Sequence, residues 1–284
     1  MDRFAYHLSI ERQLSPNTVS SYSAEVASFL SFYKGNPADC TSDDVGAYLA
    51  SRSSEIGKRS QAHALSALRC WFDYLILEGE RKDNPCDKID APKLGRYLPE
   101  VLSVEEVMSI LEAVPLNSLT GVRDRAILEV LYGCGLRVSE ACSLRLSAID
   151  SERGFVRIVG KGDKERLVPI GQPALDALAE YLASRPEPAP GYEDYAFLNR
   201  FGKALSRVAV FNMVKQRALE AGVRKSISPH TFRHTFATHL VENGADLRIV
   251  QEMLGHESVL TTEIYTHIDS QTWQAEVLKH HPRK

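Results

Sequence analysis

Apolar residues in the first third of the chain recur every three or four positions, which is the spacing of amphipathic helices. One such stripe follows Ser15 and Pro16, which can cap and lead a helix, and it consists of Tyr22, Val26, Phe29 and Leu30. Another helix is predicted from the acidic start at 41–44, and a longer one over 60–78. Together with a short helix before Ser15, the pattern predicts a small all-helical bundle.

The segment 90–99 interrupts this pattern with two prolines, a glycine and basic residues between them. Such a composition is typical of a linker, because proline and glycine end regular structure. We therefore expect a helical domain over residues 1–90, a linker over 91–100 and a second domain over 101–284.

Beyond the linker, helical stripes alternate with two short β-rich runs. A capping box at 103–106 opens the first helix, and further helices are predicted over 124–132, 138–144, 172–184, 205–222, 228–240, 246–253 and 272–279, with a turn or two over 258–265. The runs 155–159 and 166–170 are joined by a glycine-containing segment and predict a β-hairpin. The expected fold class is mainly α, with a helical N-terminal bundle and a small β-sheet in an α+β C-terminal domain.

The composition is that of an ordinary globular protein. The chain has 284 residues, of which 44% are hydrophobic and 25% are charged, and this length suits about two domains. Its formal net charge of −3 excludes a surface that is basic throughout, so any basic surface must be local. No apolar run approaches the roughly 18 residues of a membrane span, and the start of the chain lacks a signal-peptide pattern. We expect a cytoplasmic protein with no membrane partner.

The cysteines predict neither disulfides nor a zinc site. They are five in number and form no Cys-x-x-Cys pair: Cys40, Cys70, Cys86, Cys134 and Cys142. Free thiols in a reducing compartment are the expected state.

A basic face lies opposite the apolar stripe of the predicted helix over 60–78. It consists of Lys58, Arg59, His63 and Arg69, and the linker adds Lys93 and Arg96. A charged helix face is usually solvated surface, which is the alternative here. If the protein binds DNA, these lysines and arginines are the expected phosphate contacts.

The most informative stretch is the predicted helix over 228–240. Ser228 and Pro229 have the pattern of an N-cap and a first helical position. His230 and Arg233 are three residues apart, so they share a face in the first turn. An imidazole and a guanidinium at a helix N-terminus favour an anion, and phosphate fits best. The alternative is a surface helix that carries a few basic residues.

A second anion-binding pattern surrounds Arg137. Glycines at 133 and 135 stop the preceding helix and let the backbone approach another group closely. Glu140 lies one turn after Arg137 and can orient it, whereas the alternative is a surface arginine–glutamate pair of little energetic value. Lys161 lies between two glycines in the hairpin loop, where it can enter an active site. A solvated turn lysine is the alternative for Lys161.

Taken in order, these segments resemble the tyrosine recombinases, and the whole chain is similar to the bacterial Xer recombinases. The motifs are Gly-Leu-Arg-Val-Ser-Glu at 135–140, Gly-Lys-Gly-Asp-Lys-Glu-Arg at 160–166, His-Thr-Phe-Arg-His-Thr-Phe-Ala-Thr-His at 230–239, Leu-Gly-His at 254–256 and Tyr-Thr-His at 265–267. Each motif alone is weakly specific, but the combination in this order is highly specific. The closing Lys-His-His-Pro-Arg and the lack of an N-terminal arm-binding domain favour Xer proteins over phage integrases.

The resemblance implies a nucleophile and a general acid. Tyr265 would attack a DNA phosphodiester and form a 3′-phosphotyrosyl bond, with a 5′-hydroxyl as the leaving group. Lys161 would be the general acid that protonates the 5′ oxygen. Because the bond energy is kept in the covalent link, no ATP, metal or other cofactor is expected.

The resemblance also implies a set of groups that hold the phosphate. Arg137 and Arg233 would grip the phosphoryl oxygens through the paired N–H groups of their guanidiniums. His230 and His256 would donate hydrogen bonds to the same oxygens, and His230 could also take the tyrosine proton. Glu140 would support the site.

The histidines of the helix over 228–240 invite a comparison with metal sites. His230 and His234 are four residues apart, as two zinc ligands on one helix would be. Position 231 is threonine, so the metalloprotease pattern with glutamate after the first histidine is absent. We expect no metal, and we expect His234 and His239 to be packed or hydrogen-bonded in the core.

The expected substrate is double-stranded DNA with a specific site, bound by a tetramer on two paired sites. The tetramer would contain this chain alone or with a second Xer-type recombinase, and an FtsK-type DNA translocase is a further expected partner. The resemblance implies resolution of chromosome dimers at a dif-like site during segregation. The alternatives are an integrase or resolvase of a mobile element with the same chemistry, a type IB topoisomerase, and a non-catalytic DNA-binding regulator.

The C-terminal segment carries one more pattern. Residues 272–279 predict a short helix with Trp273, Val277 and Leu278 on one apolar stripe. So short a helix must pack on something. The resemblance implies docking on a neighbouring subunit, and the alternative is that the segment folds back on its own domain.

Overall fold

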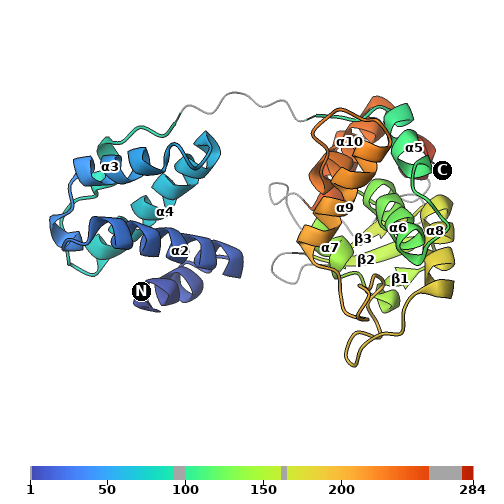
Figure 1. Cartoon of the computed structure of the whole chain (residues 1–284), viewed down its shortest axis with the longest axis horizontal. Coiled ribbons are helices and arrows are strands. Elements are labelled where there is room, and N and C mark those ends of the chain that lie inside the picture. Colours follow the sequence, from blue (N-terminus) through green and yellow to red (C-terminus); the bar gives the residue numbers. More distant parts are fainter. Residues whose placement is uncertain (1, 93–99, 161–164, 256–276, 284) are drawn as a thin grey trace. The chain divides into compact units, whose positions relative to one another are not determined.

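The computed structural model describes residues 2–92, 100–160, 165–255 and 277–283. The chain divides into two compact units, Met1–Tyr97 and Leu98–Lys284, and each is described by itself (Figure 1). None of the helices in the described ranges is long and apolar enough to cross a membrane.

The first unit is built from helices. They are α1 (Asp2–Tyr6), which continues as a π-helical turn over His7–Glu11, α2 (Pro16–Tyr33), α3 (Ser42–Arg52) and α4 (Lys58–Leu77), with 3-10 turns at Pro37–Asp39 and Pro85–Lys88. Ser15 caps α2, because its Oγ accepts a hydrogen bond from the amide of Thr18 at 3.2 Å. The predicted helical bundle is confirmed, although α4 begins at Lys58 rather than at Ser60.

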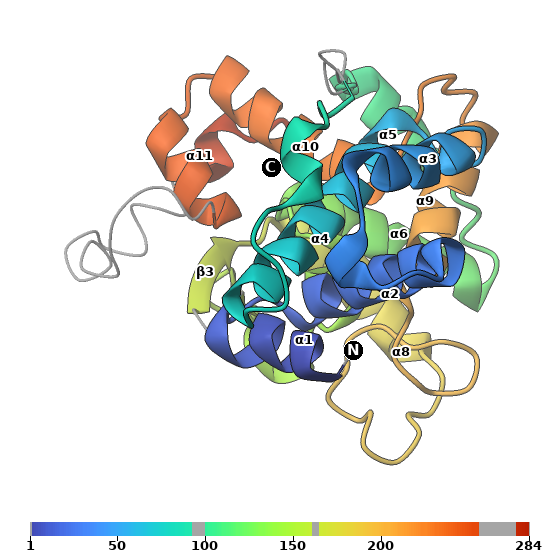
Figure 2. The same ribbon diagram turned by 90° about the vertical axis from the view of Figure 1, so that its left-hand side faces the viewer.

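An aromatic core joins the helices of the first unit. Figure 2 shows the ribbon of these helices from another side. Phe29 of α2 meets the rings of Tyr48 on α3 and of Trp71 and Phe72 on α4, with centroids between 5.2 and 6.0 Å apart. These edge-to-face contacts add to the free energy gained by burial. The core therefore fixes which face of α4 is turned to solvent.

Arg69 of α4, one of the predicted phosphate contacts, bonds within its own unit. Its Nη2 donates to the carbonyl oxygens of Cys86 at 3.0 Å and Ile89 at 3.5 Å, which holds the segment after α4 in place. Lys58 and Arg59 are exposed. A DNA contact of Arg69 stays a prediction and would compete with these two bonds. The remaining predicted contacts, Lys93 and Arg96, lie outside the described residues.

The second unit combines helices with a small sheet. Its elements are α5 (Val104–Glu112), α6 (Leu119–Gly133), α7 (Val138–Cys142), a 3-10 turn (Leu146–Ala148), β1 (Ile149–Asp150), β2 (Phe155–Val159), β3 (Glu165–Pro169), α8 (Gln172–Ser184), α9 (Arg207–Glu220), α10 (Pro229–Glu242) and α11 (Leu247–Leu254). Residues 277–280 form a further helical turn. The fold class is thus as predicted, mainly α with a small sheet.

The sheet is antiparallel, with the order β1-β2-β3 in the described part of the chain. Ile158 pairs with Arg166 and Val156 with Val168, so the predicted hairpin is confirmed. Strand β1 was not predicted, because two residues carry no alternation. Along β3, Arg166 and Val168 are buried while Glu165 and Leu167 are exposed, which turns Arg166 toward the interior.

Helix α6 lies at the centre of the second unit, between α8 and α10 (Figure 1). Every residue from 126 to 132 is buried, so these two turns are enclosed on all sides. The helix also begins at Leu119, earlier than predicted, because Ser118 caps it through the amide of Gly121 at 3.1 Å. A Cβ on Gly121 would lie 1.7 Å from the Pro115 carbonyl oxygen, so only glycine fits this first turn.

The described part of the C-terminal segment packs on its own domain. Val277 is buried, and the buried ring of His281 contacts the rings of Tyr132 and Phe236. Arg283 donates two hydrogen bonds of 2.7 Å to the carboxylate of Glu129, which is buried in α6. Residues 277–283 therefore contact their own unit, which is the alternative given above, and docking of the segment on a neighbouring subunit stays a prediction. Residues 272–276 of the predicted helix lie outside the described residues.

The Arg283–Glu129 pair gives a testable estimate of what this docking contributes. We expect Arg283→Met to lower the free energy of unfolding by about 1–3 kcal/mol, because the buried carboxylate loses its two-bond partner and keeps Arg125. Urea denaturation measures the change. Lys279→Met is the control, since Lys279 is exposed on the same segment. Equal losses in the two variants would mean that the pair does not anchor the C-terminal segment.

Candidate functional site

A buried carboxylate lies at the centre of the candidate site. Glu140 lies in the first turn of α7 and has a side chain only 7% exposed. Its Oε1 accepts from Arg137 Nη1 at 2.9 Å, and its Oε2 accepts from the Arg137 backbone amide at 2.8 Å. The alternative of a surface pair is therefore wrong, because Glu140 is buried and fixes both the backbone and the guanidinium of Arg137. The side chain of Arg137 remains 38% exposed and can reach a ligand.

Arg166 of β3 is a second partner of Glu140, which the sequence analysis did not single out. Its Nη2 donates to Glu140 Oε2 at 2.8 Å, and its Nε donates to the carbonyl oxygen of Met253 at 2.8 Å. Arg166 ends the motif at 160–166, and it shares the inward face of its strand with Val168. The signal in the sequence was the spacing of Arg166 and Val168: residues two apart in a strand point to the same face, which here is the buried one.

Arg233 is buried in α10 and points into the same cluster. Its Nη1 donates to the Gly135 carbonyl oxygen at 2.7 Å and lies 3.9 Å from Glu140 Oε2, while its Nη2 donates to the carbonyl oxygen of Leu254. Burial first, and then the charges of Arg137 and Arg166, lower the pKa of Arg233 to about 10 against the opposing effect of Glu140. At neutral pH this guanidinium is still a cation.

Gly135 makes the approach of α10 possible. Its φ is +59°, a conformation that favours glycine, and a Cβ there would lie 2.4 Å from Cδ1 of Phe236. The close backbone approach predicted for the glycine pair is thus the packing of Phe236 on Gly135. The carbonyl of the same residue holds Arg233, so the position of the glycine sets the position of the guanidinium.

The C-terminal end of α11 completes the cluster. Among the described residues, three arginines donate to its last carbonyls: Arg166 to Met253, Arg233 to Leu254, and Arg137, through Nη2, to Gly255 at 3.1 Å. Cations are favoured there, because the last carbonyls of a helix carry partial negative charge. Gly255 ends α11 with a φ of +65°. The cluster thereby fixes the residue that directly precedes His256.

The N-terminus of α10 carries His230, which is close in sequence to Arg233 of this cluster. Ser228 caps the helix through the amide and the hydroxyl of Thr231, and Pro229 is its first residue, both as predicted. His230 is exposed, three residues before Arg233. The first turn therefore offers an accessible imidazole at a helix N-terminus, three residues from a buried guanidinium, which suits an anion.

Three predicted site residues, Lys161, His256 and Tyr265, lie outside the described residues. Their chain neighbours are placed: Gly160 follows β2, and Gly255 follows α11.

The other histidines of α10 divide between core and surface. His239 is buried, with Nδ1 2.8 Å from the Tyr132 hydroxyl and Nε2 2.9 Å from the Leu102 carbonyl oxygen, as predicted. His234 is exposed, so its predicted core position is wrong. It is two residues from both Phe232 and Phe236, which places it on the opposite side of the helix. Within the described ranges, no group of three or more His, Cys, Asp or Glu residues could hold a metal ion.

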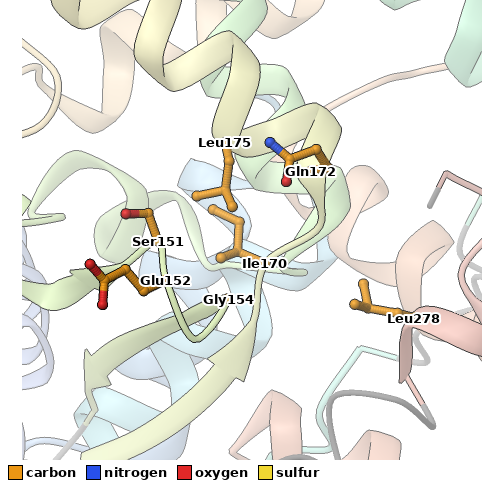
Figure 3. A pocket seen from close by; sticks show the side chains of 7 residues that line it. All are labelled: Ser151, Glu152, Gly154, Ile170, Gln172, Leu175 and Leu278. Carbon is orange, nitrogen blue, oxygen red and sulfur yellow. The ribbon is translucent and has the colours of Figure 1, made fainter.

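A pocket of about 250 Å³ lies elsewhere on the second unit (Figure 3). Its walls come from the β1–β2 turn, the start of α8 and the C-terminal segment: Ser151, Glu152, Gly154, Ile170, Gln172, Leu175 and Leu278. Most of its side chains are apolar or neutral, and it contains none of the arginines that surround Glu140. The pocket is therefore not the candidate site.

Two protein-family models match the chain. The model of the phage integrase family matches residues 100–272, and that of the N-terminal SAM-like domain of phage integrases matches residues 1–79. Together they cover both units of the structure.

The similar proteins are recombinases over their full length. A protein of Chlorobaculum tepidum named tyrosine recombinase XerD is 43% identical over 298 residues, which cover 100% of this chain and 96% of that protein. A protein of the same name from Listeria monocytogenes is 39% identical over 292 residues, covering 100% and 98%. Among solved structures, the XerH site-specific recombinase in a post-cleavage complex with palindromic difH substrate has a TM-score of 0.73 and 25% identity, covering 92% of this chain and 79% of that one.

Proposed function

This chain belongs to the phage integrase family and is a site-specific tyrosine recombinase of the Xer type, and we propose that Tyr265 is its nucleophile. The enzyme would cut and rejoin duplex DNA through a 3′-phosphotyrosyl intermediate. The observation that carries the assignment of the phosphate site is the arginine cluster at Glu140. Arg137 and Arg233 both donate hydrogen bonds to carbonyl oxygens at the end of α11, and the side chain of Arg137 remains partly exposed.

In the proposed reaction the charge of the scissile phosphate decides which groups are needed. Attack by the Tyr265 oxygen places additional negative charge on the non-bridging oxygens, and Arg137 and Arg233 hold these oxygens with N–H groups. His230 donates from the exposed start of α10, and His256 from the residue after Gly255. No metal enters this scheme, because fixed cations replace it.

Proton transfers balance the reaction. The hydroxyl proton of Tyr265 goes to a base, for which His230 is the candidate, because tyrosine with a usual pKa of about 10 is a weak nucleophile in its neutral form. The bond between phosphorus and the 5′ oxygen breaks, and Lys161 gives its proton to that oxygen. Rejoining reverses each step, with a 5′-hydroxyl of the partner strand as the nucleophile.

The biological role that we propose is resolution of chromosome dimers at a dif-like site during segregation. Supporting it are the XerD names of the full-length relatives and the difH substrate of the similar XerH structure. The substrate would be double-stranded DNA carrying two paired sites, bound by a tetramer of this chain or of this chain with a second Xer-type recombinase. An FtsK-type translocase would activate exchange, and the reaction would take place in the cytoplasm, where the chromosome lies.

Exchange in a purified system tests this role. The protein is incubated with two duplexes that carry the dif-like site of its host, with and without a second Xer-type recombinase, and recombinant products are scored by length. Products that depend on two sites support the proposal. Relaxation of supercoiled DNA without exchange would indicate a topoisomerase, and binding without a covalent adduct a non-catalytic regulator. An integrase of a mobile element would require that element's own ends.

DNA binding should depend strongly on salt although the net charge is −3. Four to five phosphate contacts from Lys58, Arg59, Lys93, Arg96 and Arg69 would give a slope of log affinity against log salt of about −4. Titration of a single-site duplex at several KCl concentrations measures it. Lys58→Gln removes one of these contacts and should make the slope less steep. Lys82→Gln, at a basic residue outside the predicted face, is the control and should leave the slope unchanged. A slope near zero in the unmodified protein would mean that these residues are solvated surface.

A further inference from the structure

Arg166 is unusual among the residues of the sheet because a charged side chain takes an inward position. It is the second residue of β3 and pairs with Ile158 of β2. Its side chain is only 7% exposed. Burying a guanidinium costs free energy unless its N–H groups are satisfied, so the bonds of this residue show what it holds.

The bonds of Arg166 join separate parts of the second unit. Nη2 donates to Glu140 of α7, and Nε donates to the Met253 carbonyl at the end of α11, each at 2.8 Å. The side chain also passes beneath Gly255, where an added Cβ would lie 3.5 Å from Cδ and 3.7 Å from Cζ of Arg166. One rigid, planar group therefore spans the hairpin, the start of α7 and the end of α11.

Glu140 depends on this contact for its charge. Burial acts to raise the pKa of Glu140, but the hydrogen bond and charge of Arg166, and after them the bonds of Arg137, outweigh burial and hold that pKa below its usual value. An ionised Glu140 accepts from Arg137 at both oxygens, so the anchoring of Arg137 follows from the presence of Arg166.

We propose that Arg166 is a positioning residue of the cleavage reaction: it aligns Arg137, through Glu140, with the end of α11 that leads into His256. This inference rests on the proposed function of the site. In this proposal Arg166 does not itself bind the phosphate: its Nε and Nη2 are directed to Met253 and Glu140, and it acts through Arg137, which Glu140 holds. It fixes the geometry of the groups that stabilise the negative charge of the transition state.

Arg166→Lys tests the proposal with little risk to the fold, because it keeps a cation beside Glu140 but cannot form both directed bonds. Single-turnover cleavage of a nicked duplex at saturating protein should slow by about 10- to 100-fold, the usual effect of small misplacements in an active site. Affinity for the duplex should stay as in the wild type. Arg153→Lys is the matched control, since Arg153 lies in the turn before β2 with an 83% exposed side chain.

A second substrate separates positioning from general damage. A methylphosphonate at the scissile position has lost the charge of one non-bridging oxygen. Its transition state therefore carries less negative charge for the arginines to stabilise. If Arg166 acts through Arg137, the defect of Arg166→Lys on this substrate should be at least about tenfold smaller than on the phosphodiester, as for Arg137→Lys. Equal slowing on both substrates, or cleavage of the phosphodiester at the wild-type rate, would overturn the proposal.

Hydrogen exchange gives a readout that does not need cleavage. In the DNA-free Arg166→Lys protein, amides of residues 247–255 should exchange about tenfold faster, because the end of α11 has lost an anchor, while α8 should keep its wild-type protection. Unchanged exchange in α11 would overturn the anchoring. The double variant Glu140→Gln, Arg166→Gln removes both buried charges together and must show the same pattern if the lysine variant does not fold. A wild-type protein that forms no covalent adduct would instead refute the proposed function, and the exchange experiment would still decide the anchoring.

Discussion

Tyr265→Phe is expected to abolish covalent attachment to DNA while leaving site binding within about twofold of the wild type, because only the nucleophilic hydroxyl is removed. The experiment uses a suicide duplex with a nick near the cleavage point, from which the released fragment diffuses away and leaves the adduct trapped. A denaturing gel separates the protein–DNA adduct from free DNA. A mobility-shift titration of the same preparation measures binding.

A tyrosine elsewhere in the second unit provides a matched control for this experiment. Tyr192 is partly exposed in the segment between α8 and α9, and Tyr192→Phe removes a hydroxyl without touching the candidate site. It should form the adduct at the wild-type rate. An adduct that persists in Tyr265→Phe at the wild-type level would show that another residue is the nucleophile.

Arg137→Lys is expected to reduce the single-turnover cleavage rate by on the order of 10²- to 10³-fold, the range observed when one donor to a developing oxyanion is removed. The structure gives the reason. Arg137 uses Nη1 for Glu140 and Nη2 for Gly255, so the direction of its plane is fixed and one side remains open. A lysine ammonium has the charge but cannot hold two oxygens in that plane.

The control for Arg137→Lys asks whether any surface arginine of this unit has the same effect. Arg207 is exposed at the start of α9, and Arg207→Lys should cleave within about threefold of the wild type at saturating protein, because loss of one exposed contact acts mainly on binding. Single-turnover rates on the suicide duplex, with affinity measured separately, make the comparison. A wild-type rate for Arg137→Lys would remove Arg137 from the site.

What could be predicted from the sequence was local in the chain. Ser15, Ser103 and Ser228 cap helices as their patterns indicate, because a cap needs only the next three residues. The pair formed by Arg137 and Glu140 is also local, and it was found for the same reason. Helical periodicity would also have predicted that His234 is exposed, since a residue two positions from both Phe232 and Phe236 must face away from their stripe.

What could not be predicted depends on contacts between distant segments. The bond from Arg166 to Met253 joins residues far apart in the chain, and a lone arginine in a strand carries no sign of such a partner. The same is true of Arg283, whose carboxylate partner Glu129 lies on a helix buried on all sides. Since the C-terminal pattern of apolar residues does not name the surface it covers, docking in cis and docking on a neighbour were equally compatible with it.

The identity of the attached amino acid is the most direct test of the central claim. Wild-type protein is trapped on the nicked duplex, protease and nuclease digest the adduct, and mass spectrometry locates the remaining nucleotide on the peptide. The account predicts a single 3′-linked nucleotide on the peptide that contains Tyr265, with fragment ions that assign it to the tyrosine oxygen. Attachment at any other residue, or no adduct on a duplex that carries the correct site, would contradict it.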